Sequence, residues 1–318
     1  MVSVPAGYRE AMGEYSDYLT GEVVVDYADG VIDRREALRQ LGLLGVGVTV
    51  AGPMLAACDE EGGSGDASGG PAGGTSGTPG ASGSAPAGPA PLATEAITFA
   101  GAEGRTLQGA WAAAGSPRGA VLVIHENRGL TDHIRSVAGR FAASGYSALA
   151  IDLLSAEGGT AKFSDPAQAT AALNAAPPAR FTADMRAGID ELMRRTPGKK
   201  PAAVGFCFGG GMVWSLLASG ESRLGAAAPF YGPFPSGADL AGSKNTAVLG
   251  VYAALDSRVN ASRDTAKAAL EKAGQPHEIV TFDGADHAFF NDTGARYQAT
   301  AAASAYQRVL DWFGRYLT

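Results

Sequence analysis

The chain has 318 residues, of which 46% are hydrophobic and 18% charged, enough apolar side chain for a large core, and this excludes an intrinsically disordered protein. The formal net charge is −7 and no basic stripe occurs, so we expect no nucleic-acid partner. The two cysteines, Cys58 and Cys207, are too few for a disulfide framework. No Cys/His cluster has zinc spacing, so we expect neither a metal nor an organic cofactor.

The first 33 residues are acidic, with a net charge of −6, and an abrupt change of character follows them. Arg34-Arg35 stands before an uncharged apolar stretch, residues 41–57, which contains four glycines and Pro53. At about 17 residues this stretch is at the lower limit for spanning a bilayer and is rich in helix breakers, so the core of a signal peptide fits it better. An uncleaved membrane anchor and a buried helix are the alternatives.

Two short motifs frame this stretch and indicate export. The arginine pair resembles the twin-arginine (Tat) signal. The sequence Leu55-Ala56-Ala57-Cys58 resembles the lipobox of bacterial lipoproteins, in which the cysteine is lipidated and becomes the first residue of the mature protein. We therefore predict export by the Tat route and a lipid anchor at Cys58, which would hold the protein on the periplasmic or extracytoplasmic face of a membrane.

Residues 59–93 have low complexity, because 28 of the 35 are Gly, Ala, Ser or Pro. Such a segment cannot bury enough apolar area to offset its ordering entropy, so we predict a flexible tether with an end-to-end distance of roughly 30 Å. The predicted organisation is an acidic and signal-like region over residues 1–57, a linker over 58–94 and a globular domain over 95–318.

The globular part alternates short apolar runs with segments of helical periodicity. We expect strands at residues 97–99, 106–112, 120–124, 147–154, 202–205, 226–231, 247–253 and 278–282. We expect helices at residues 132–144, 167–175, 181–195, 209–219, 264–273 and 301–316. Strands that alternate with helices predict an α/β fold with a mostly parallel sheet and helices on both faces.

The segment Gly205-Phe206-Cys207-Phe208-Gly209 lies between a predicted strand and a predicted helix. It has the pattern of a nucleophile elbow, with cysteine in place of serine. Such a turn strains its central residue and leaves no room for side chains two positions away, which explains the glycines. The sulfur is expected at the N-terminus of a helix, where the helix dipole favours a thiolate. The alternative is a buried cysteine in a glycine-rich packing turn.

Asp256 and His287 each follow a predicted strand, at the carboxyl edge where α/β sheets place their functional groups. Nucleophile, then acid, then histidine is the chain order of the α/β-hydrolases. His287 would act as general base and Asp256 would fix its tautomer. The alternatives are a surface-loop histidine and a helix-capping Asp256, with Asp283 and Asp286 as competing carboxylates.

A further motif, His125-Glu126-Asn127-Arg128-Gly129, follows the first buried strand. Together with the elbow, the aspartate after its strand and the late histidine, it resembles the dienelactone hydrolase family, the Cys-nucleophile branch of the α/β-hydrolases. The resemblance covers residues 96–316 and implies the α/β-hydrolase fold.

The resemblance also implies roles for individual residues. Cys207, Asp256 and His287 would form the catalytic triad. Glu126 would lie beside the thiol and hold it neutral until substrate arrives, unless it is instead a buried carboxylate paired with Arg128 or another cation. The backbone N–H groups of Asn127 and Phe208 would form the oxyanion hole.

Family members that act on dienelactone hold the substrate carboxylate with arginines, and Asn291 stands near the place expected for one of them. Arg128, Arg258 and Arg296 are candidates to replace it. We expect Arg128, Tyr231 and Phe289 to line the substrate pocket.

The sequence therefore predicts a carboxylic-ester hydrolase that cleaves small esters, lactones or thioesters through an S-acyl enzyme. The expected partners are a small-molecule substrate and, through the lipid anchor, a membrane. The alternative is a non-catalytic ligand-binding lipoprotein on a hydrolase fold, because fold alone does not establish function.

Overall fold

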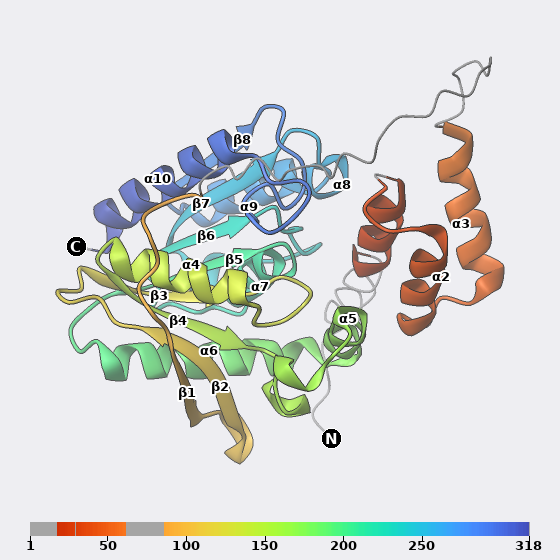
Figure 1. Ribbon diagram of the computed structural model, residues 1–318. Coiled ribbons are helices and arrows are strands. Elements are labelled where there is room, and N and C mark those ends of the chain that lie inside the picture. Colours follow the sequence, from red (N-terminus) through yellow and green to blue (C-terminus); the bar gives the residue numbers. More distant parts are fainter. Residues whose placement is uncertain (1–17, 29, 62–85, 318) are drawn as a thin grey trace, which may run out of the picture.

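The computed structural model, which describes residues 18–28, 30–61 and 86–317, is built on an eight-stranded sheet with the order β1-β2-β4-β3-β5-β6-β7-β8 (Figure 1). Strand β2 pairs antiparallel with β1 and β4, and all other neighbours pair parallel. The strands are β1 (Glu95–Ala100), β2 (Thr106–Ala112), β3 (Gly119–Ile124), β4 (Tyr146–Asp152), β5 (Pro201–Phe206), β6 (Ala226–Phe230), β7 (Ala247–Ala253) and β8 (His277–Phe282). Strands β3 to β7 are buried along their whole length, as is typical of a parallel sheet covered on both faces.

Helices cover both faces of this sheet (Figure 1). On one face α4 and α10 pack together through Phe141, whose ring centroid lies 5.3 Å from that of Tyr306 and 6.0 Å from that of Phe313. On the other face α6 and α7 contact each other and the central strands. These four helices are α4 (Asp132–Ala143), α6 (Pro178–Arg195), α7 (Phe208–Ala218) and α10 (Ala299–Tyr316), and α5 (Pro166–Ala175), α8 (Ser257–Asn260) and α9 (Arg263–Ala273) complete the domain.

The N-terminal part is helical: residues 18–28 are followed by α2 (Arg34–Leu43) and α3 (Val48–Glu61). Asp33 caps α2 by accepting the Glu36 backbone N–H at 2.8 Å. A small apolar cluster joins the three helices, formed by Val23, Ala37, Leu41, Ala51 and Leu55. Among the described residues, no helix combines the length and the apolar character needed to cross a bilayer.

The predicted α/β-hydrolase fold is confirmed, and each expected strand and helix of the globular part is present within a few residues of its predicted bounds. The short helix α8 was not expected. Within residues 41–57, predicted as the core of a signal peptide, Leu41 and Leu55 are buried in the small cluster. Residues 1–17 of the acidic region and residues 62–85 of the predicted linker lie outside the described residues. Cys58 falls within α3, and its lipidation stays a prediction.

Candidate active site

Cys207 occupies a strained turn between β5 and α7. Its backbone has φ 57° and ψ −119°, a combination that residues other than glycine rarely adopt. A Cβ added at Gly205 would lie 2.1 Å from the Gly209 carbonyl oxygen, and one added at Gly209 would lie 2.4 Å from the Ile124 carbonyl oxygen. Close backbone approach therefore requires both glycines, for the reason that the sequence pattern indicated. The turn leaves Cys207 as the N-cap of α7, and Phe208 is the first residue of that helix.

Asp256 and His287 are brought together beside this turn. The His287 Nδ1 and Asp256 Oδ2 atoms are 2.6 Å apart, and both side chains are only 3% exposed. The other Asp256 oxygen accepts the Val259 backbone N–H at 3.1 Å and caps α8, so the residue is a helix cap as well as the partner of the histidine. Asp286 accepts the backbone N–H of His287 at 2.6 Å, and Asp283 is exposed. The geometry therefore favours Asp256 over these two carboxylates as the partner of the imidazole.

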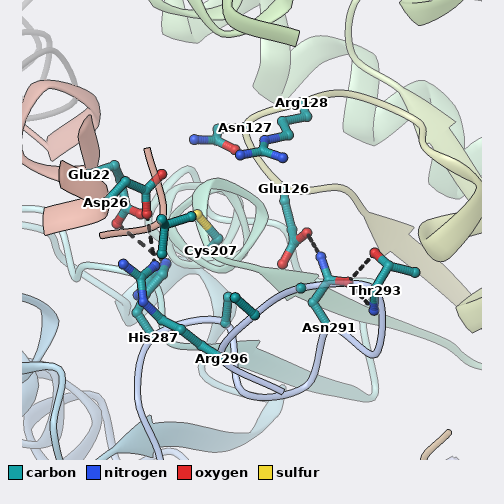
Figure 2. A pocket seen from close by; sticks show the side chains of 14 residues that line it. Glu22, Asp26, Glu126, Asn127, Arg128, Cys207, His287, Asn291, Thr293 and Arg296 are labelled. Carbon is teal, nitrogen blue, oxygen red and sulfur yellow. Dashed lines mark hydrogen bonds and ion pairs between the residues drawn. The ribbon is translucent and has the colours of Figure 1, made fainter. Parts of the chain in front are cut away.

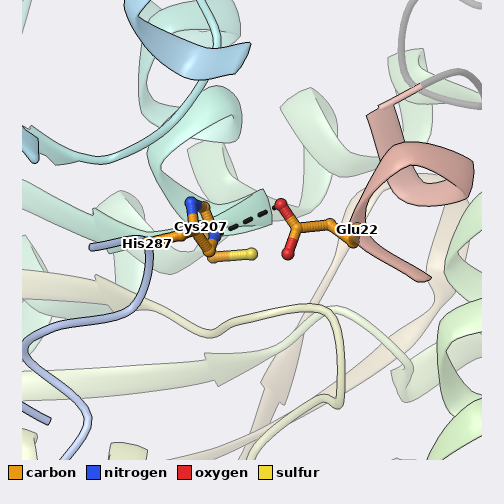
Figure 3. A group of neighbouring side chains, drawn as sticks. All are labelled: Glu22, Cys207 and His287. Atoms are coloured by element: carbon orange, nitrogen blue, oxygen red, sulfur yellow. Dashed lines mark ion pairs between the residues drawn. The ribbon is translucent and has the colours of Figure 1, made fainter. Parts of the chain in front are cut away.

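Two further groups come from the helical segment 18–28, which the sequence analysis did not place at the site. The Tyr18 hydroxyl lies 3.2 Å from the Cys207 sulfur and 3.4 Å from His287 Nε2. A Glu22 oxygen lies 3.3 Å from the same Nε2 atom (Figure 3). Tyr18, Glu22 and Asp26 are spaced four residues apart, which puts them on one face of a helix. This spacing could have predicted a helix with one polar face, but the region was interpreted only as a targeting sequence.

Arg258, on α8, holds this segment in place. Its guanidinium forms an ion pair with Glu22, and its Nη1 donates to the Tyr18 carbonyl oxygen at 2.8 Å. The same guanidinium lies over the Tyr18 ring, 4.8 Å from the ring centroid. Arg258 is therefore engaged by the N-terminal segment and does not replace a substrate-binding arginine in this arrangement.

The charges around the imidazole set the protonation states of the site. Burial alone would lower the pKa of His287, but the carboxylates of Glu22 and Asp256, on opposite sides of the ring, together with the Cys207 sulfur raise it well above its ordinary value. Burial and the Glu22 charge raise the pKa of the Cys207 thiol, and the nearby imidazole only partly offsets them. The raised thiol pKa favours the neutral form of Cys207, and the raised imidazole pKa favours the protonated form of His287 between the two carboxylates.

Glu126 faces the same pocket from the loop after β3, but it is held on the far side from Glu22 (Figure 2). Asn291 Nδ2 donates to Glu126 Oε2 at 2.6 Å. The alternative pairing of Glu126 with Arg128 is absent from the ion pairs of the described residues. Glu126 does contribute to raising the pKa of the Cys207 thiol, but less than Glu22 does. Glu22 thus has the larger effect on the pKa of the Cys207 thiol, although the family resemblance indicated Glu126 for this role.

These groups surround a pocket of about 290 Å³ (Figure 2). Its walls come from the helical segment 18–28, the loop after β3, the elbow and the loop after β8. Asn127, the predicted oxyanion-hole residue, lines the pocket, and its carbonyl oxygen accepts the Thr170 hydroxyl at 2.9 Å, which fixes the loop. The pocket therefore gives a small ligand access to the sulfur.

Of the three arginines considered as substrate anchors, two are engaged. Arg258 binds Glu22, and Arg296 Nη1 lies 2.8 Å from an Asp26 oxygen. Arg128 is exposed at the pocket wall and has no ion pair within the part of the chain that the structure describes. Arg128 is therefore the cation that a substrate can reach.

Tyr231 and Phe289 do not line the pocket, which corrects the expectation from sequence. Both residues are 0% exposed. The Tyr231 ring lies 5.1 Å from the His287 ring and 5.5 Å from the Phe289 ring, measured between centroids. Sequence placed these aromatics at the right end of the sheet but could not tell which side of the histidine they pack on. Tyr231 packs against the His287 ring, and Phe289 packs against Tyr231.

Glu22, Cys207 and His287 could also hold a metal ion, since one ligand atom from each lies within 4.8 Å of the other two (Figure 3). Carboxylate, thiolate and imidazole are ligands that Zn²⁺ accepts. The mutual charge balance of these three side chains accounts for their proximity, so we assign no metal to the site.

Comparison with known proteins agrees with this geometry. The model of the dienelactone hydrolase family matches residues 107–317. A curated relative from Escherichia coli O157:H7, named "Putative carboxymethylenebutenolidase", is 32% identical over 213 residues, which cover 63% of this chain and 78% of the relative.

Two solved structures show the same relationship. A "Putative Dienelactone Hydrolase" from Klebsiella pneumoniae is 29% identical with a TM-score of 0.62, and a dienelactone hydrolase-like promiscuous phosphotriesterase from metagenomic libraries is 26% identical with a TM-score of 0.61. Each match covers 71% of this chain and 100% of the solved chain, so these relatives correspond to the globular domain alone. The chain therefore belongs to the dienelactone hydrolase family and, by that membership, is a carboxylic-ester hydrolase.

Proposed function

We propose that the chain hydrolyses small esters, lactones or thioesters through an S-acyl intermediate on Cys207. The observation that carries the proposal is the strained elbow that presents the Cys207 sulfur beside His287, with Asp256 Oδ2 at 2.6 Å from the far nitrogen of the ring. Nucleophilic acyl transfer requires a cysteine beside a histidine, with a buried carboxylate on the other side of the imidazole ring.

The reaction has two halves. The Cys207 sulfur attacks the substrate carbonyl carbon while its proton passes to His287 Nε2. The carbonyl oxygen becomes an oxyanion, which the backbone N–H groups of Asn127 and Phe208 stabilise. The tetrahedral intermediate collapses, the C–O bond breaks, and His287 returns the proton to the leaving oxygen. Water, deprotonated by His287, then hydrolyses the thioester and releases the carboxylic acid and the free thiol.

The substrate class follows from the pocket. While the N-terminal segment lines it, the pocket has a volume of about 290 Å³, which admits a small acyl group and leaving group but not a long chain. Arg128 offers a cation at the wall, so we infer that esters or lactones carrying a carboxylate are preferred over neutral ones. The place expected for a family arginine is held by Asn291, which binds Glu126 instead. Dienelactone itself is therefore not the inferred substrate.

The test is hydrolysis of p-nitrophenyl acetate and of a thioester analogue by residues 86–318, the globular part to which the solved relatives correspond. Cys207→Ala and His287→Ala should abolish both the burst of p-nitrophenol and the turnover. His277→Ala is the matched control, because it removes a histidine that does not line the pocket, and it should retain activity. Equal rates in the wild type and the two site variants would instead favour the ligand-binding alternative.

We also propose that the protein is exported by the Tat route and lipidated at Cys58. Arg34 and Arg35 are exposed at the start of α2, where a receptor can reach them. In cells labelled with palmitate, the mature protein should carry the label and begin at Cys58. Replacing the arginine pair with lysines should leave the unprocessed chain inside the cell. Labelled protein that retains residues 1–57 would contradict the processing.

A further inference from the structure

The helical segment 18–28 covers the catalytic groups as a fitted piece and not as a loose tail. Tyr18 and Leu19 are 6% and 1% exposed and belong to the main hydrophobic core. Leu19 lines a small pocket together with Phe181, Phe208 and Met212 of the globular domain. The segment therefore buries side chains in the same region of the domain that carries the nucleophile.

Glu22 engages the atom that catalysis needs. His287 Nδ1 lies 2.6 Å from Asp256, and His287 Nε2 lies 3.3 Å from Glu22. With a carboxylate at each nitrogen, the ring is held as a doubly protonated imidazolium, which has no lone pair to accept the thiol proton. The Glu22 charge also disfavours the thiolate of Cys207.

We propose that residues 18–43 form an inhibitory plug, in which Glu22 occupies the catalytic histidine and so keeps the nucleophile in its unreactive thiol form. This inference rests on the proposed function of Cys207 and His287. In this scheme Glu22 acts through His287 and is not itself a catalytic residue.

The plug is held by contacts that can be released. Arg258 pairs with Glu22, Arg296 pairs with Asp26, and Arg39 of α2 pairs with Asp165 at the N-cap of α5. These are ion pairs and hydrogen bonds between side chains, together with the packing of Leu19 and Tyr18. Cleavage before Cys58, the processing proposed above, would remove all of these plug residues. The protein would then be inactive before export and active after it.

The experiment compares four proteins: the full chain, full-chain Glu22→Gln, full-chain Asp33→Asn as the control, and residues 86–318. The shorter protein is justified because solved relatives consist of the globular domain alone. Asp33→Asn makes the same carboxylate-to-amide change within the plug, and asparagine also caps a helix. Two rates are measured at neutral pH: alkylation of Cys207 by iodoacetamide, followed by peptide mass mapping, and hydrolysis of p-nitrophenyl acetate.

Glu22→Gln and residues 86–318 should be alkylated at least about tenfold faster than the full chain. The thiolate is the reactive form of cysteine, and lowering the pKa of the thiol by about one unit makes the thiolate fraction about ten times larger. Ester hydrolysis should rise with alkylation, and Asp33→Asn should behave as the full chain. A synthetic peptide of residues 18–43 should slow both reactions of residues 86–318 in a saturable manner.

Equal or slower alkylation in Glu22→Gln and in folded residues 86–318 would overturn the plug and make Glu22 part of the working site. Because alkylation needs no turnover, failure of the proposed function is seen separately. In that case no protein hydrolyses any ester, while the alkylation rates still report whether the plug is present.

Discussion

Replacing Asp256 with asparagine tests the assignment of the acid most directly. The change keeps the size of the side chain and its cap on α8, because asparagine Oδ1 can still accept the Val259 N–H. It replaces the oxygen that lies 2.6 Å from His287 Nδ1 with an amide group that donates. The imidazole must then accept at Nδ1 and carry its proton on Nε2, which is the wrong tautomer for taking the thiol proton.

The size of the effect follows from the burial of the pair. Both side chains are 3% exposed, so solvent does not screen the interaction. A hydrogen bond to a charged group contributes about 1.5–3 kcal/mol, or roughly 10- to 150-fold in rate. The wrong tautomer adds to this, and the same change in a serine protease triad costs about 10⁴-fold in kcat. We therefore expect Asp256→Asn to lower kcat for p-nitrophenyl acetate by about 10²–10⁴-fold.

Asp286→Asn is the control, because Asp286 bonds the backbone of His287 and not its ring. It should stay within a few-fold of the wild type. If Asp286→Asn lost the activity and Asp256→Asn kept it, the reasoning from the 2.6 Å contact would be refuted and Asp286 would be the acid.

Three further variants probe the elbow, the loop and the anchor. Gly205→Ala should yield little folded protein, because its Cβ would lie 2.1 Å from a backbone oxygen, and normal urea unfolding would contradict this. Asp292→Asn should lower the free energy of unfolding by about 3 kcal/mol, because it removes the partner of the buried Arg140. Burial opposes ionisation of Asp292, but His133 and Arg140 lower its pKa. The stabilisation by Asp292 is therefore complete above about pH 4 and is lost as the pH falls through the lowered pKa. A stability difference between wild type and Asp292→Asn that grew in acid would contradict this role. Arg128→Gln should raise KM about 3- to 10-fold for an ester carrying a carboxylate and leave KM for p-nitrophenyl acetate unchanged, whereas equal effects on both would remove Arg128 as an anchor.

The globular fold was predictable because its signals are local and redundant. Continuous apolar runs marked the buried strands, and glycines at positions 205 and 209 marked a turn that no larger residue fits. The order of Cys207, Asp256 and His287 along the chain then placed three side chains at one edge of a parallel sheet. Each of these features follows from backbone geometry, which a sequence pattern records directly.

The contents of the pocket wall were less predictable, because they depend on which side chain reaches which partner. Glu126 belongs to the motif that the family resemblance places beside the thiol, yet Asn291 binds it, and Glu22 is the carboxylate that lies 3.3 Å from His287 Nε2. Aromatic residues after a strand, such as Tyr231 and Phe289, are equally consistent with a pocket wall and with the hydrophobic core. Such choices are made by tertiary contacts between segments more than 50 residues apart, which hydrophobic periodicity does not report.

The N-terminal region shows why a targeting motif should not end the structural interpretation of a segment. Arg34-Arg35 and the apolar stretch after it were sufficient to predict export, and the acidic residues before them then had no assigned role. Their charges nevertheless match the domain, because Glu22 meets Arg258 and Asp26 meets Arg296. A segment that serves only as a targeting signal would not need to place two carboxylates four residues apart opposite two arginines of the globular domain. The same residues can serve both purposes if export removes them, since an esterase kept inactive until it leaves the cytoplasm does not act on the esters and thioesters found there.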